Sequence, residues 1–284
     1  MKIAMIGATG PLGRRLTARL LAAGHEVLAI GRSAERLGGL GLPSRIADCY
    51  DRPSLTAALK DARVMVSCAS SRTTPHVLEA LPAGIERVVL TGSTRRFTKF
   101  PDQIARQLMR AEALMESARI PGTIVYPTMI CGEDGERNVQ RIAAFIRRFG
   151  AVPLPDAGRM LVRPIYTGDV AACLEAALFR PDASGARIVV AGRDSVSYAD
   201  LVRGVAAAIG ARVRIVSVPA SLLMAAAPLT RLLPGVPTIT VAEVRRLLED
   251  KSFPIDDMRQ RLGVEPIGLA EMLARTFGGT PNAK

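Results

Sequence analysis

Three glycines stand between a short apolar run and a helical segment near the start of the chain. Gly7, Gly10 and Gly13 follow the run Ile3–Ile6 and open the segment Leu12–Ala23, whose leucines recur on one helical face. Such a turn lets the main chain reverse at the first glycine, approach a phosphate at the second and pack helix against strand at the third. The helix N-terminus adds N–H groups and a partial positive charge. The pattern predicts a unit that holds the diphosphate of a dinucleotide; the alternative is a turn that binds nothing.

Apolar runs alternate with helical segments along much of the chain. The runs are uniformly apolar, which is typical of parallel strands covered by helices on both faces. Repeated strand–helix units with right-handed crossovers predict an α/β fold, a doubly wound parallel Rossmann sheet with a smaller, mostly helical C-terminal lobe. We expect a dinucleotide-binding domain over residues 1–127, completed by 163–192, and a substrate lobe over 128–162 and 193–284. The first six expected strands are Ile3–Ile6, Glu26–Ile30, Arg45–Ala47, Arg63–Ser67, Arg87–Leu90 and Thr123–Tyr126.

The chain is strongly basic, and the excess is nearly all arginine. Its 284 residues carry a formal net charge of +12, with only five lysines. The coding bias of a GC-rich genome explains this skew without any specific role. No block of five or more like charges occurs, so we expect no nucleic-acid partner. A basic surface favours anionic small molecules or an anionic membrane surface as partners.

Neither a metal site nor a membrane span is predicted. The four cysteines are far apart and the chain has only two histidines, which leaves no set of metal ligands. No apolar run reaches the roughly 18 residues that a membrane span needs. The first residues have the pattern of a strand rather than of a signal peptide. We therefore expect a cytoplasmic protein, and nothing in the sequence selects an oligomeric state.

The end of the second expected strand bears on which dinucleotide is bound. An acidic residue there takes the ribose hydroxyls of NAD, but this stretch continues with Arg32 and Ser33 and has no carboxylate before Glu35. A guanidinium group pairs with a phosphate through charge-assisted hydrogen bonds, and the serine adds a donor. The sequence favours NADP(H) over NAD(H) as cofactor. The alternative is that Arg32 is a solvated loop residue.

The glycine spacing, with its Gly-Ala-Thr-Gly sequence, resembles the extended and atypical branches of the short-chain dehydrogenase/reductase superfamily. The resemblance implies that Asp48 lies near the adenine amino group, although a turn or helix-cap role fits it nearly as well. It also implies that Ser93, after the fifth strand, hydrogen-bonds the substrate oxygen, with Thr94 as the alternative and a strand cap as the structural interpretation. The residues that the resemblance places around the cofactor are Gly7, Thr9, Gly10, Pro11, Leu12, Gly13, Arg32, Ser33, Asp48, Cys68, Ala69, Ser70, Thr91, Pro127, Thr128 and Met129.

The superfamily's proton donor has no counterpart in this sequence. Catalytic members use a tyrosine followed four residues later by a lysine, which lowers the tyrosine pKa. None of the four tyrosines here is followed by lysine at that spacing. If the protein is an enzyme, Tyr126, Tyr166 or a water must supply the proton. Several nearby cations could hold an anionic substrate or the cofactor phosphates, or be solvated surface charges: Arg95, Arg96, Lys99 and Arg106.

The C-terminal part resembles one atypical subgroup of the superfamily. Four segments, Ser195–Asp200, Val213–Pro219, Leu232–Pro234 and Glu249–Phe253, are similar to the tail of the accessory subunit of respiratory complex I and of related NAD(P)H-binding proteins. NmrA-like redox sensors are further relatives. That resemblance implies a tightly held NADPH without turnover. An oxidoreductase or epimerase/dehydratase-like enzyme and a non-catalytic NADPH-binding protein therefore both remain open.

One apolar helical stretch in this part has two interpretations. Ala220–Leu229 is the most apolar helical stretch and is followed by Arg231. It could line the substrate cleft, or it could lie in the headgroup layer of a membrane. A peripheral membrane contact, or a contact within a protein complex, therefore stays open.

Overall fold

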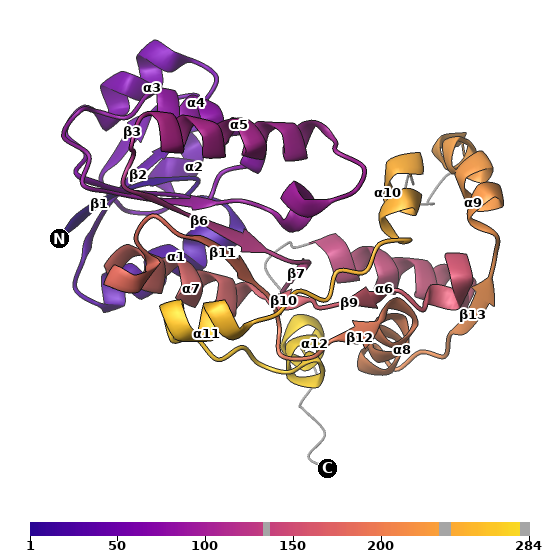
Figure 1. Ribbon diagram of the computed structural model, residues 1–284. Helices are drawn as coiled ribbons and strands as arrows, with labels where there is room; N and C mark the ends of the chain where they lie inside the picture. Colours follow the sequence, from indigo (N-terminus) through magenta and orange to yellow (C-terminus); the bar gives the residue numbers. More distant parts are fainter. Residues whose placement is uncertain (133–136, 233–239, 279–284) are drawn as a thin grey trace.

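The computed structural model describes residues 1–132, 137–232 and 240–278, and it divides into two lobes (Figure 1). A seven-stranded parallel sheet fills the first lobe, in the order β11-β6-β5-β4-β1-β2-β3. This order confirms the doubly wound α/β fold. The strands are β1 (Lys2–Ile6), β2 (Glu26–Gly31), β3 (Ser44–Ile46), β4 (Val64–Ser67), β5 (Arg87–Thr91), β6 (Gly122–Pro127) and β11 (Arg187–Val190).

Helices cover both faces of this sheet. Successive residues of a strand point to opposite faces, so Ile3 and Met5 of β1 enter one core and Ala4 and Ile6 enter the other. This double burial is the reason for the uniformly apolar runs in the sequence. One face carries α1 (Pro11–Ala22), α7 (Thr167–Phe179) and α11 (Asp256–Leu262), and the other carries α3 (Arg52–Leu59), α4 (Thr74–Glu79) and α5 (Gln103–Ser117) (Figure 1).

The strand order reverses direction at the centre of the sheet. Strand β1 lies between β2 and β4, so the chain builds outward on one side and then crosses to build outward on the other. The loops that leave the carboxyl ends of β1 and β4 therefore diverge and leave a crevice, which is where open α/β sheets bind ligands.

The second lobe is mostly helical and has a core of its own, which includes Val139, Leu201 and Leu273. Its helices are α6 (Arg137–Phe149), α8 (Tyr198–Ala208), α9 (Ala220–Ala226), α10 (Val241–Arg246) and α12 (Leu269–Phe277). Within the described residues, two-stranded pairs join β7 (Ile130–Cys131) to β10 (Ile165–Tyr166), β8 (Ala151–Leu154) to β13 (Arg214–Ser217), and β9 (Leu161–Val162) to β12 (Val196–Ser197).

The C-terminal segment does not pack as one unit with this lobe. Helix α11 lies against α7 and β11, and its buried residues Met258 and Leu262 join the core beneath the sheet. These residues are four apart and share one helical face. By packing, this part of the range 193–284 belongs with the sheet rather than with the lobe to which the sequence assigned it.

The apolar helical stretch Ala220–Leu229 is not one continuous α-helix. Helix α9 ends at Ala226 and a 3₁₀ helix, η5 (Ala227–Leu232), continues the chain. Pro228 has no N–H to donate and its ring clashes with a preceding turn, which opposes an uninterrupted helix. Leu233 lies outside the described residues.

Short helical turns complete the structure. They are α2 (Ala34–Gly38), η1 (Ser71–Thr73), η2 (Thr94–Phe97), η3 (Pro155–Gly158) and η4 (Pro181–Ala183). No helix in the described part of the chain has the length and apolar character needed to cross a membrane.

Candidate functional site

A cavity of about 920 Å³ lies between the carboxyl edge of the sheet and the second lobe. Residues from the ends of β4, β5 and β6 form one side, and α10 with the chain that follows it contributes to the other. The predicted site residues in its wall are Gly10, Pro11, Leu12, Gly13, Cys68, Ala69, Ser70, Thr91, Ser93, Pro127, Thr128 and Met129. The predicted residues Gly7, Thr9, Arg32, Ser33 and Asp48 are not part of this wall.

Each of the three glycines of the turn is needed for a different structural reason. Gly7 has a φ of +83°, and a Cβ there would lie 2.8 Å from the main-chain nitrogen of Ala69. A Cβ on Gly13 would lie 2.1 Å from the carbonyl oxygen of Gly7. At Gly10 a Cβ would make only an ordinary contact, 3.5 Å from the same oxygen, but Gly10 borders the cavity. Two glycines therefore allow close packing, and the third keeps the main chain accessible to a ligand.

The start of α1 offers main-chain donors to the cavity. Gly10 has no side chain with which to cap the helix, and Pro11 has no N–H group. The first main-chain hydrogen bond of the helix runs from Arg14 N–H to the Gly10 carbonyl at 2.8 Å. The N–H groups of Leu12 and Gly13 precede that bond, and both residues border the cavity. This arrangement fits a diphosphate.

The end of β2 carries Arg32 beside the glycine turn. The Arg32 side chain is 75% exposed, and its Nη1 lies 3.9 Å from Oδ2 of Asp48. The other carboxylate oxygen of Asp48 accepts a hydrogen bond from the N–H of Tyr50 at 2.9 Å. Ser33 caps α2 by accepting from the N–H of Arg36 at 3.2 Å. Arg32 and Asp48 thus lie together, and the Asp48 side chain also stabilises a turn.

Residues at the ends of β4 and β5 face the cavity. Burial raises the pKa of the Cys68 thiol to about 12, so Cys68 stays protonated at neutral pH. Ser70 accepts a hydrogen bond from the N–H of Arg72 at 3.4 Å. Ser93 likewise accepts from the N–H of Arg95, at 3.3 Å, and caps η2. A hydroxyl that accepts a hydrogen bond retains its own O–H for donation, so capping and binding by Ser93 are compatible.

Three hydrogen bonds fix the position of the turn after β6. The Thr128 hydroxyl donates to the carbonyl of Arg163 at 2.5 Å, and the Thr128 N–H donates to the carbonyl of Val190 at 3.0 Å. The next residue, Met129, accepts from the N–H of Ile165 at 2.9 Å. These bonds join β6, β10 and β11 and hold Pro127–Met129 at the cavity wall.

The tyrosines considered as proton donors lie elsewhere. Neither Tyr126 nor Tyr166 is among the residues of the cavity wall. The Tyr126 hydroxyl donates to Glu112, and burial together with that carboxylate raises its pKa above the usual range. Guanidinium groups of Arg15 and Arg275 lie 5.2 and 5.4 Å from the centre of the Tyr166 ring. Both tyrosines are therefore already engaged in packing or polar contacts.

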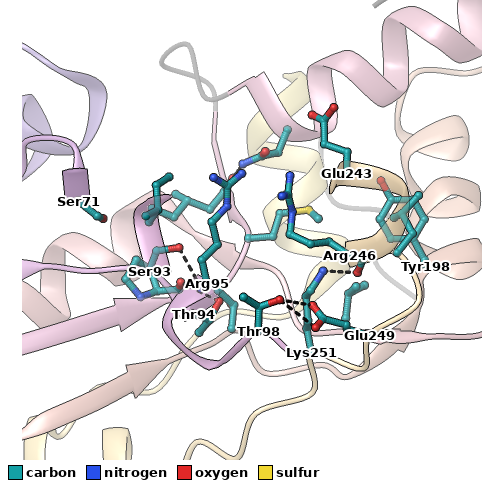
Figure 2. Close-up of a pocket in the computed structure, with 18 of the residues that line it drawn as sticks. Ser71, Ser93, Thr94, Arg95, Thr98, Tyr198, Glu243, Arg246, Glu249 and Lys251 are labelled. Atoms are coloured by element: carbon teal, nitrogen blue, oxygen red, sulfur yellow. Dashed lines mark hydrogen bonds between the residues drawn. The ribbon is translucent and has the colours of Figure 1, made fainter. Parts of the chain in front are cut away.

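Tyr198, at the start of α8, is a tyrosine that the sequence analysis did not assign to the site. It lines the cavity, and burial raises its pKa to about 12. In Figure 2, Tyr198 and Ser93 lie on opposite sides of the group of residues drawn as sticks.

A polar cluster from the second lobe was also missed by the sequence analysis. Glu249 is 9% exposed and accepts hydrogen bonds from the Thr98 hydroxyl at 2.9 Å and the Lys99 N–H at 2.7 Å (Figure 2). Lys251 donates its main-chain N–H to Leu161 of β9 at 2.8 Å. The sequence analysis identified Glu249–Phe253 only by its similarity to the C-terminal part of one subgroup. Sequence spacing cannot show that this segment contacts the loop after β5.

The four cations considered from the sequence separate into two groups. Arg95 and Lys99 line the cavity. Arg96 pairs with Glu112 at 2.8 Å, and Arg106 donates to the carbonyl of Pro101 at 3.1 Å. Neither Arg96 nor Arg106 lies in the wall, so only Arg95 and Lys99 stay candidates for holding a ligand in the cavity.

Comparison with known proteins agrees with this geometry. A family model described as NAD(P)H-binding matches residues 7–181, which is more than half of the chain and begins at the glycine turn. The chain belongs to the NAD(P)H-binding family. The resemblance inferred from the glycine spacing is thus confirmed at the level of family and fold.

Curated relatives of this NAD(P)H-binding protein match part of its length. The NADH dehydrogenase [ubiquinone] 1 alpha subcomplex subunit 9 of Arabidopsis thaliana is 27% identical over 199 residues, which cover 61% of this chain and 49% of that protein. An uncharacterized protein of Mycobacterium tuberculosis is 31% identical over 183 residues, covering 58% of this chain and 20% of that protein. The chain therefore aligns with about half or less of these relatives.

Solved structures share the fold over nearly the whole chain. The NADPH-dependent quinone oxidoreductase QOR2 of Escherichia coli, complexed with NADPH, has a TM-score of 0.78 at 21% identity and covers 97% of this chain and 99% of its own. The UDP-glucuronic acid 4-epimerase of Bacillus cereus, in complex with UDP-glucuronic acid and NAD, has a TM-score of 0.73 at 15% identity, with 98% of each chain covered. At these identities the likeness establishes the fold.

Two further features of the NAD(P)H-binding protein bear on partners. Among the residues that the structure describes, no three His, Cys, Asp or Glu side chains form a group that could hold a metal ion. None of the residues Ala220–Leu229 lines the cavity, so the interpretation of this stretch as a cleft helix is wrong. Leu222 and Leu229 of this segment are 59% and 58% exposed. A contact with a membrane or a protein complex stays a prediction.

Proposed function

We propose that this chain binds NADP(H) and acts as an oxidoreductase, or as an epimerase/dehydratase-like enzyme, on a small molecule held in the cavity. The proposal rests on one observation: the groups assigned to the cofactor and to the substrate border a single cavity. The donors at the start of α1, the hydroxyl of Ser93 and the polar residues of the second lobe all border one cavity of about 920 Å³. The nicotinamide cofactor would supply or accept a hydride there. The protein's part is to hold both molecules, to orient them and to stabilise charge on the substrate oxygen.

In this proposal the cofactor lies along the cavity wall and extends past it to residues at the ends of β1 and β2. The N–H groups of Leu12 and Gly13 donate to the diphosphate. Asp48 accepts from the adenine amino group, because its carboxylate lies beside Arg32 at the end of β2. The remaining contacts are made by Gly7, Thr9, Gly10 and Pro11 at the turn, by Cys68, Ala69 and Ser70 beneath the cofactor, and by Thr91, Pro127, Thr128 and Met129 toward the nicotinamide.

The preference for NADP(H) rests on Arg32. Its side chain is 75% exposed and its contact with Asp48 is long, at 3.9 Å, so the guanidinium can turn toward a 2′-phosphate at little cost. A hydrogen bond to a charged group contributes about 1.5–3 kcal/mol. We therefore expect Arg32→Ala to weaken NADPH binding by roughly 10- to 100-fold and to leave NADH binding nearly unchanged.

Fluorescence titration of the protein with both coenzymes tests this preference. Arg63→Ala is a matched control, because Arg63 is also 75% exposed and pairs with one carboxylate, Glu86. Equal affinity of the unaltered protein for NADPH and NADH would refute the assignment of Arg32.

The enzyme proposal assigns Ser93 to the substrate oxygen. Its hydroxyl borders the cavity after β5, and its capping bond to Arg95 N–H holds the side chain in place. The test is NADPH oxidation, followed by absorbance, with quinones, aldehydes and nucleotide sugars as substrates. Turnover that Ser93→Ala abolishes would support an enzyme.

A non-catalytic NADPH-binding subunit or redox sensor is the second candidate. The observation in its favour is that the hydroxyl of Tyr126 donates to Glu112, outside the cavity wall. The similarity to a plant NADH dehydrogenase subunit points the same way. Native mass spectrometry of the purified protein separates the two candidates: co-purified NADPH, together with no turnover of any substrate, would favour the non-catalytic protein.

A further inference from the structure

Three cations in the cavity wall come from separate parts of the chain. Arg95 belongs to η2, Arg246 ends α10, and Lys251 lies in the segment that pairs with β9. They gather at the centre of Figure 2, between Ser93 on one side and Tyr198 on the other. A cluster built from three elements is a product of the fold and not of a local run of basic residues.

One carboxylate is shared between the two arginines. Oδ2 of Asp102 lies 3.3 Å from Nη1 of Arg95 and 3.7 Å from Nη1 of Arg246. The ammonium group of Lys251 donates to the main-chain carbonyl of Arg246, which carries no charge. The charge of one carboxylate is thus divided between two guanidinium groups.

The acidic residues of the same wall form hydrogen bonds with groups other than these three cations. Glu249 accepts from Thr98 and from the N–H of Lys99. Asp250 accepts from the N–H of Leu161 at 2.7 Å, and Glu243 accepts from Arg141 at 3.1 Å and caps α10. Glu249 and Glu243 also attract the neighbouring cations and raise the pKa of Arg246, but their hydrogen bonds are made to other groups of the wall.

Bringing these like charges together is unfavourable, and a bound anion would add to the attraction that Asp102 supplies. The Arg246 side chain is only 17% exposed, and charged side chains are rarely so buried unless they are paired. Burial and the neighbouring charge of Arg95 lower the pKa of Arg246, although Asp102, Glu243 and Glu249 oppose them. A bound oxyanion would offset both effects, since guanidinium and ammonium groups donate strongly to carboxylate and phosphate oxygens.

We propose that Arg95, Arg246 and Lys251 form a binding subsite for the anionic group, a carboxylate or a phosphate, of the substrate. This rests on the proposed function, because the substrate then occupies the cavity beyond the nicotinamide. The subsite lies between Ser93 and Tyr198 in Figure 2, and two of its three members, Arg246 and Lys251, come after the last strand of the sheet in the chain. The cofactor phosphates are assigned instead to α1 and to Arg32, near β1 and β2.

Calorimetric titration of the NADPH-loaded protein with malonate and with inorganic phosphate tests the subsite. We expect Arg246→Gln and Lys251→Gln each to weaken anion binding by about tenfold or more, and Arg246→Lys to restore part of it. Arg106→Gln is the control, because it removes one positive charge outside the cavity wall. The tighter of the two anions identifies the group that the subsite takes.

The same variants distinguish the subsite from the cofactor site. NADPH affinity, measured by fluorescence, should stay unchanged in Arg246→Gln and Lys251→Gln. The proposal is overturned if neither anion binds, if the two variants bind the anions as tightly as the unaltered protein, or if NADPH affinity falls in parallel. If the protein binds the anions with the expected pattern but not NADPH, the subsite stands and the proposed cofactor function fails.

Discussion

Gly7 and Gly13 are in direct main-chain contact across the turn: a Cβ atom on Gly13 would lie 2.1 Å from the carbonyl oxygen of Gly7. Helix α1 therefore begins as close to β1 as the main chain permits. Because of this approach, the N–H groups of Leu12 and Gly13 lie at the cavity wall rather than beneath a layer of side chains.

Replacing Gly13 by alanine should disturb this contact. The added methyl group forces the helix away from the turn, and overpacking of this kind costs about 1–3 kcal/mol of unfolding free energy. We expect Gly13→Ala to lower the melting temperature and to weaken NADPH binding by tenfold or more. Gly84→Ala is the control, since a Cβ there meets nothing within 4 Å. NADPH affinity that Gly13→Ala leaves intact would contradict the assignment of the turn.

Replacing Ser93 by alanine should affect turnover and leave the fold intact. The side chain caps only the short helix η2, whereas its hydroxyl would stabilise charge on the substrate oxygen. Loss of one such donor lowers kcat by roughly 100-fold. Steady-state kinetics on Ser93→Ala and on Ser184→Ala, an exposed serine outside the cavity wall, checks this. A Ser93→Ala protein with full activity would leave Ser93 as a helix cap only.

The sheet and the glycine turn could be predicted because their signals are local. A uniformly apolar run such as Ile3–Ile6 indicates a strand buried on both faces, and the structure places it inside the sheet, between β4 and β2. The glycines follow that strand directly and open α1. Short elements such as α2 (Ala34–Gly38), which is five residues long, lack the length that makes helical periodicity visible.

The far wall of the cavity could not be predicted because it depends on contacts between distant segments. Thr98 and Glu249 are 151 residues apart in the sequence, yet their side chains are hydrogen-bonded. The apolar residues Met258 and Leu262 predict a helix, but not that it packs beneath the sheet rather than in the second lobe. Composition and spacing carry no information about which surface such a segment meets.

Replacing Tyr126 by phenylalanine should reduce stability without affecting turnover. The Tyr126 hydroxyl donates to Glu112, which also pairs with Arg96 at 2.8 Å. Hydrogen bonds to charged groups contribute about 1.5–3 kcal/mol, so we expect Tyr126→Phe to lower the unfolding free energy by about that amount in urea titration. Tyr50→Phe, at a side chain that is 59% exposed, should change it little. Loss of turnover in correctly folded Tyr126→Phe would instead make this tyrosine the proton donor.

Anion binding at the proposed subsite should weaken as the pH rises through the pKa of Lys251. That pKa is lowered to about 8: burial lowers it most, the charge of Glu249 raises it, and the charges of Arg246 and Arg95 lower it. Below about pH 8 the side chain is an ammonium ion and attracts the anion. Above that pH it is neutral and this attraction is lost, whereas the arginines stay charged.

Malonate is a suitable probe for this titration because it stays fully ionised between pH 7 and about pH 9.5. We expect its affinity to fall by about tenfold across that range in the unaltered protein, with a midpoint at or above the pKa of Lys251, since a bound anion favours the protonated form. In Lys251→Gln the affinity should be low and nearly independent of pH. A parallel pH dependence in the variant would assign the change to another group and remove Lys251 from the subsite.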